Sequence, residues 1–85
     1  MYIAKVVGKV IAPQKVTSLQ GSKLLLIQSI DANRKIINEK EYLVAIDLVG
    51  AGDNDCVLVE WGSQLSHDDN LRGDLHIVGI IESIQ

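Results

Sequence analysis

The sequence is poor in the residue types that carry enzyme chemistry. Among 85 residues there are one cysteine, two histidines, two tyrosines, one tryptophan and no phenylalanine. Because Cys56 is the only cysteine, no disulfide can form within the chain. His67, Asp68 and Asp69 lack the additional ligands that a zinc or calcium site requires. We therefore expect no metal, no cofactor and no catalytic site.

Two sequence patterns resemble known chemical motifs only in part. The segment 50–55 begins like a glycine-rich dinucleotide loop, but an aspartate occupies the third glycine position and no long helix is predicted after it. Ser63 follows Gly62 but lacks the second glycine of a nucleophile elbow. A solvated acidic turn and the start of a short helix are the simpler interpretations.

The chain also lacks long hydrophobic runs. No segment approaches the ~18–20 apolar residues of a membrane-spanning helix. Residues 1–5 do not combine a basic start with an apolar stretch, as an export signal does. We therefore expect no membrane contact and a reducing, cytoplasmic setting, in which a single free thiol is unremarkable.

Aliphatic residues are abundant in this chain, and their arrangement predicts short strands. Hydrophobic residues form 47% of the chain, and the single proline and several polar clusters separate the apolar stretches. This pattern predicts an all-β fold. We expect a single domain over residues 1–85, a small five-stranded OB-like β-barrel with one short helical turn near Gly62 and Ser63. The predicted strands are 2–12, 23–30, 42–49, 56–60 and 75–84, with a turn at 31–35 and a short strand end at 36–37.

These strands are apolar on both faces. In a half-buried strand, apolar and polar residues alternate, but Leu24 to Ile27 and Ile77 to Ile81 do not. No predicted helix is long enough to cover the outer face. A domain of 85 residues is also marginally stable alone. We therefore expect the outer surface to be covered by other copies of the chain.

Charge is divided unevenly along the sequence. Residues 1–46 carry seven basic and three acidic side chains, and residues 47–85 carry one basic and eight acidic. Unlike halves could pair between copies. In the alternative interpretation, both halves interleave in one barrel and the charges mix on its surface.

The segment 45–52 combines an apolar strand, one carboxylate and a Gly-Ala-Gly corner. An ionised Asp47 in an apolar run needs a partner or a place at an interface. Gly50 and Gly52 permit unusual backbone angles or close approach of another chain. We therefore take Asp47, Val49, Gly50, Ala51 and Gly52 as candidate subunit-interface residues.

Three parts of the sequence match one known pattern in their order and spacing: residues 5–10 with 14–15 and 19–26, residues 44–52 with 57–59 and 62–63, and residues 78–84. Together they resemble the EutN/CcmL family of bacterial microcompartment vertex proteins, which includes carboxysome proteins. It implies a non-enzymatic barrel that forms a homopentamer and closes the five-fold vertices of a shell tiled by hexameric shell proteins. It also implies a narrow opening on the five-fold axis.

The candidates for the rim of that opening are Pro13, Gln14, Lys15 and Asp53. The chain departs from the family pattern in several places, including the residues after Gly62-Ser63 and the loop at Pro13. It has Gln64-Leu65-Ser66 where relatives often carry Ser-Ala-Arg after Gly-Ser, and Pro13 replaces a threonine.

Two other interpretations remain open at this point. A stand-alone OB-like barrel could bind a ligand or nucleic acid, although nucleic acid favours a basic groove with stacking aromatics, which this chain lacks. A small regulatory subunit of an enzyme would also be oligomeric, but it would need an enzyme partner.

Overall fold

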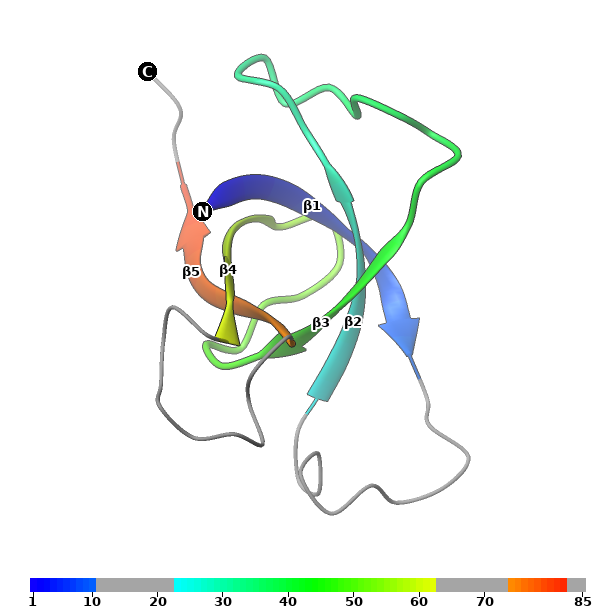
Figure 1. Ribbon diagram of the computed structural model, residues 1–85. Helices are drawn as coiled ribbons and strands as arrows, with labels where there is room; N and C mark the ends of the chain where they lie inside the picture. The colour runs from blue at the N-terminus through cyan, green and yellow to red at the C-terminus, as the bar shows by residue number, and fades with distance from the viewer. Residues whose placement is uncertain (11–22, 63–73, 83–85) are drawn as a thin grey trace.

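A computed structural model describes residues 1–10, 23–62 and 74–82, and these form a closed five-stranded β-barrel (Figure 1). The strands pair in the order β1-β2-β3-β5-β4, and β4 closes the barrel against β1. All pairings are antiparallel except β3 with β5. The predicted all-β barrel is confirmed. The strands are β1 (Tyr2–Val10), β2 (Lys23–Ser29), β3 (Leu43–Asp47), β4 (Cys56–Trp61) and β5 (Leu75–Ile81).

Most strand boundaries agree with the prediction to within one or two residues. The third strand is shorter than predicted, because the Asp47 carboxylate binds the next backbone amides and ends it at Asp47. The fourth extends one residue further, to Trp61. The fifth ends at Ile81, short of the predicted Ile84, because the chain bends at Glu82. The end predicted at Ala12 and the helical turn from Ser63 onward lie outside the described residues. No described segment forms a helix of the length and hydropathy that crossing a membrane requires.

The predicted turn at 31–35 is present and is held by its first residue. The Asp31 Oδ1 atom accepts hydrogen bonds from the amides of Asn33 and Lys35, at 2.8 and 3.1 Å. Arg34 adopts a positive φ of 64°. The single bridge between Ile30 and Ile36 corresponds to the short strand end expected there.

The barrel interior is filled by aliphatic side chains that alternate along each strand. Ala4 and Val6 of β1 and Val57 and Val59 of β4 belong to this core, and all four side chains are fully buried. Burying one Val, Leu or Ile contributes about 1.5–3 kcal/mol. The other core residues are Leu25, Ile27, Ala45, Ala51, Leu75 and Ile77.

Two bulges, one in β1 and one in β5, interrupt this alternation. In β1 the register against β2 shifts between Val6 and Gly8, as the internal glycine predicts. In β5 the register against β4 shifts so that Val59 pairs with Ile77 while Leu58 pairs with Gly79. The extra residue of a bulge changes the direction in which the following side chains point, and it bends the strand.

The barrel brings charges of the two halves of the sequence together within one chain. β1 and β2 carry Lys5, Lys9 and Lys23, with no acidic residue within either strand. The carboxylate of Asp47, in β3, lies 3.5 Å from Lys23 Nζ, and the carboxylate of the buried Glu60, in β4, lies 3.3 Å from the Met1 amino group. Within the described strands, both acidic side chains are therefore paired with a positive charge from the first half of the sequence.

Candidate subunit interface

The carboxylate of Asp47 organises the corner that follows β3. Its Oδ1 atom accepts hydrogen bonds from the amides of Val49 and Gly50, at 3.0 and 3.1 Å. Its Oδ2 atom lies 3.5 Å from the Nζ atom of Lys23, and only 2% of the side chain is exposed. The partner that the sequence required for this carboxylate is therefore supplied within the chain.

These contacts also set the protonation of Asp47. Burial raises the pKa of this carboxyl group, but the amides of Val49, Ala51 and Gly50 and the charge of Lys23 lower it by more. The pKa of Asp47 thus lies below its ordinary value, and the group is ionised at neutral pH.

The corner is fastened to two other strands. Lys23 of β2 donates from Nζ to the carbonyl oxygen of Ala51 at 2.6 Å. The amide of Asn54 donates to the Val6 carbonyl, and the amide of Val6 donates to the Asp55 carbonyl, both at 2.9 Å. The corner is therefore a fixed part of the barrel.

The predicted interface residues differ in how much surface they present. Val49 is 41% exposed and the adjacent Leu48 is 58% exposed, whereas Ala51 is fully buried in the core. Gly50 has a φ of 85°, which favours glycine. Asp53 is exposed, and Pro13, Gln14 and Lys15 lie outside the described residues.

Lys23 was not singled out from the sequence, although it is the partner of Asp47. A signal was present: pairing β2 with β3 in antiparallel register places Lys23 directly opposite Asp47. Opposite charges at facing positions of two strands stabilise that pairing. Finding it would have required knowing which strands pair.

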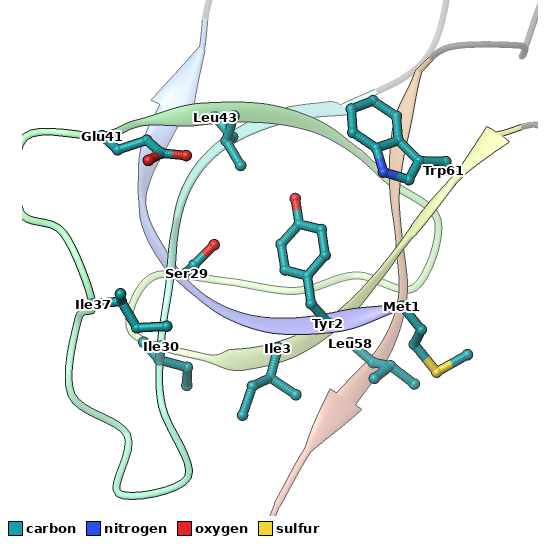
Figure 2. Close-up of a pocket in the computed structure, with 10 residues that line it drawn as sticks. All are labelled: Met1, Tyr2, Ile3, Ser29, Ile30, Ile37, Glu41, Leu43, Leu58 and Trp61. Carbon is teal, nitrogen blue, oxygen red and sulfur yellow. The ribbon is translucent and has the colours of Figure 1, made fainter.

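The end of the barrel where β1 begins contains an open apolar hollow of about 740 Å³ (Figure 2). The ring of Tyr2 points into it, between Leu43 and Trp61. The Tyr2 hydroxyl is buried and has no hydrogen-bond partner among the described residues. Burial, and to a lesser degree the nearby Glu41, raise the pKa of this phenol.

The polar side chains of the described residues do not form a catalytic arrangement. His76 is fully buried, and its Nδ1 atom lies 3.1 Å from the carbonyl oxygen of Asp74. Cys56 is buried as a free thiol. Within residues 1–10, 23–62 and 74–82, no three His, Cys, Asp or Glu side chains are grouped so that they could hold a metal ion.

Outward-facing side chains of the strands are largely apolar. Val44 of β3 is 48% exposed and Ile80 of β5 is 43% exposed, and Leu24, Leu26 and Leu58 are partly exposed. This surface agrees with the two-faced strand pattern of the sequence. A small barrel with such a surface is suited to packing against other proteins.

The curated relatives of this chain match it along almost its whole length. It is 35% identical to the microcompartment shell vertex protein GrpN of Rhodospirillum rubrum, over all of this chain and 97% of that one. It is 39% identical to the carboxysome shell vertex protein CcmL of Synechococcus elongatus, over 99% of this chain and 86% of that one.

Solved structures show the same fold. The pentameric microcompartment shell protein GrpN of Rhodospirillum rubrum superposes with a TM-score of 0.82 at 31% identity, covering 100% and 98% of the two chains. CcmL of Nostoc superposes with a TM-score of 0.82 at 39% identity, covering 100% and 93%. The family model described as "Ethanolamine utilisation protein EutN/carboxysome" matches residues 1–82, and the chain therefore belongs to the EutN/CcmL family.

Proposed function

We propose that this protein is a structural subunit of a bacterial microcompartment shell in the cytoplasm, and that five copies form a ring that caps a shell vertex. The observation that carries the proposal is the apolar outer surface of a barrel that is already closed. Because β4 pairs with β1, the sheet is closed and no strand is left as a free edge strand. We therefore expect association to use side chains on the outer face, of which Val44 and Ile80 are the most exposed strand residues with aliphatic side chains.

The family relationship supports five-fold assembly. Relatives named as shell vertex proteins match nearly the whole chain, and the structural neighbour GrpN is described as pentameric. In the proposed ring each copy meets its neighbour through two different surfaces, as closed cyclic symmetry with five copies requires. The stabilising contribution is apolar burial, at about 25 cal/mol per Å².

The Gly-Ala-Gly corner is a proposed contact point between subunits. Exposed Leu48 and Val49 stand on a backbone that Asp47 and Lys23 hold rigid, so little conformational entropy is lost when they pack. Within the ring we place Asp47, Val49, Gly50, Ala51 and Gly52 at or near this contact. We place Pro13, Gln14, Lys15 and Asp53 at the rim of the axial opening.

The outer rim of the ring meets hexameric shell proteins in this proposal, and the protein has no catalytic activity of its own. The buried carboxylate, thiol and imidazole of the described residues serve the fold.

Native mass spectrometry at low micromolar concentration tests the proposal. The expected result is a dominant species near five times the 9.3 kDa chain mass. Co-expression with hexameric shell proteins should then yield closed shells, and omission of this protein should leave them open at the vertices. A monomer in the first experiment would contradict the proposal and favour a stand-alone ligand-binding barrel.

A further inference from the structure

Four strands present an inward-facing side chain at the same end of the barrel. Side chains alternate between the two faces of a strand, and two residues further into the barrel each of these strands carries a buried core residue. The four end residues are Tyr2 of β1, Ser29 of β2, Leu43 of β3 and Trp61 of β4, and all of them line the apolar hollow (Figure 2). The hollow therefore lies directly over the barrel core.

The remaining wall of the hollow is almost entirely aliphatic. The segment between β2 and β3 contributes Ile30 and Ile37, and the rim of the barrel contributes Met1, Ile3 and Leu58. The volume of the hollow is about 740 Å³. Sites for small molecules typically have volumes of ~300–1,000 Å³ and are lined by apolar and aromatic side chains with a few polar groups. The hollow has the size and the lining of such a site.

The hydroxyl group of Tyr2 lacks a partner. It is buried, and no described residue forms a hydrogen bond with it. Leaving a buried hydroxyl unpaired is unfavourable, and native structures contain few such groups. The Tyr2 side chain is only partly buried, and it packs on the core at the hollow. A small tilt of the ring therefore brings the hydroxyl to an acceptor atom of a molecule in the hollow.

The charges at the hollow favour an uncharged occupant. Among the ten described lining residues, only Glu41 has a charged side chain. Its negative charge acts on the Tyr2 phenol and would also repel an anion placed there. The Met1 amino group lies 3.3 Å from the Glu60 carboxylate, so it is already paired. An ammonium group could approach Glu41, but it has no acceptor to offer to the phenol.

We propose that this hollow binds an uncharged small molecule with an aliphatic or aromatic body and one carbonyl or hydroxyl oxygen. The oxygen accepts a hydrogen bond from the Tyr2 hydroxyl, and the body packs against Leu43, Trp61 and the aliphatic wall. This binding activity is additional to the proposed structural role and does not depend on the number of copies in the assembly.

Four probes that share a benzene ring separate the possible classes of ligand. Acetophenone has a neutral carbonyl group, toluene has no polar group, benzoate is an anion and benzylammonium is a cation. Trp61 is the only tryptophan and lines the hollow, so its indole N–H gives one reporter signal in a proton–nitrogen correlation NMR spectrum. We expect acetophenone to shift this signal saturably and to bind about five-fold more tightly than toluene. Benzylammonium should bind more weakly than acetophenone, and benzoate should bind most weakly.

The variant Tyr2→Phe removes the hydroxyl group and keeps the ring. We expect it to bind acetophenone about five-fold more weakly than the unmodified protein does, and to bind toluene equally well. Tyr42→Phe is the matched control, since Tyr42 is 55% exposed and does not line the hollow. It should bind both probes as the unmodified protein does. Circular dichroism checks that each variant keeps its β spectrum.

Several results would overturn the inference. They are the absence of a saturable shift with acetophenone, binding of toluene or benzylammonium as tight as that of acetophenone, and an unchanged acetophenone affinity in Tyr2→Phe. If Tyr2→Phe loses its β spectrum, the ranking of the four probes on the unmodified protein decides. Native mass spectrometry of the same samples reports the assembly separately. A pentamer that binds no probe overturns this inference and leaves the proposed function standing, whereas a monomer that binds acetophenone does the reverse.

Discussion

The Asp47 carboxylate is both buried and ionised. Its contacts therefore make the free energy of unfolding depend on pH. Its pKa is lower in the folded chain than in the unfolded chain. Its contribution is therefore fully present above the unfolded value of about 3.9 and is lost as the pH falls through the lower folded value. We expect Asp47→Asn to be less stable than the unmodified protein at pH 7 and to lose less stability between about pH 5 and pH 2. Urea denaturation at a series of pH values measures both effects.

The control for this prediction is Asp53→Asn, which alters an exposed carboxylate next to the same corner. We expect it to retain the acid sensitivity of the unmodified protein. Equal pH profiles for Asp47→Asn and the unmodified protein would contradict the role assigned to the Asp47 contacts.

Tyr2 provides the corresponding prediction at alkaline pH. Burial and Glu41 raise its pKa in the folded barrel, so the contribution of Tyr2 to folding stability is constant below the unfolded value of about 10 and declines as the pH rises from there through the folded value. We expect Tyr2→Phe to reduce this decline, as followed by thermal unfolding between about pH 9 and pH 11. The exposed Tyr42 is the matched site: Tyr42→Phe should leave the decline in place. The opposite ranking of the two variants would show that Tyr2 is not the responsible group.

At the scale of elements, the corner after β3 depends on the backbone angle of one residue. Gly50 has a φ of 85°, and apart from its two chain neighbours no atom of the described residues lies within 4 Å of the position that a Cβ would occupy. The cost of Gly50→Ala is therefore a backbone cost alone, about 1–2 kcal/mol of unfolding free energy. Gly50→Asn should cost less, because asparagine tolerates the left-handed region. Denaturant titration compares the two variants, and equal losses would show that the φ angle is not the cause.

The sequence predicted the positions of the strands better than it predicted which strands pair. Aliphatic runs bounded by Pro13, by Asp31 and by the Gly-Ala-Gly corner were sufficient to identify five strands and an internal bulge at Gly8. The end of β3 was wrong by two residues, because local side-chain bonding by Asp47 competes with strand pairing. The parallel pairing of β3 with β5 could not be predicted, since it joins residues such as Ile46 and His76 that lie far apart in sequence.

The same distinction applies to the candidate interface. An isolated carboxylate in an apolar run indicated that Asp47 needs a partner or a place at an interface. The structure supplies a partner within the chain, and the place at a subunit interface stays a prediction. The sequence did not identify Lys23 as that partner, nor the burial of Ala51, because both depend on how β2 and the corner come together.

The seam between β3 and β5 joins only two residue pairs, Ile46 with His76 and Asp47 with Ile77, supplemented by one bond from the Leu48 amide to the Ile77 carbonyl at 3.3 Å. All other neighbouring strands share at least four pairs. Local opening of a protein is easiest where few hydrogen bonds must break. We therefore expect the barrel to open first between β3 and β5. Deuterium should reach the amides of Leu48 and Ile77 before those of Leu25 and Ile27. Each copy can thus open locally between β3 and β5 while its other strand pairs stay hydrogen-bonded.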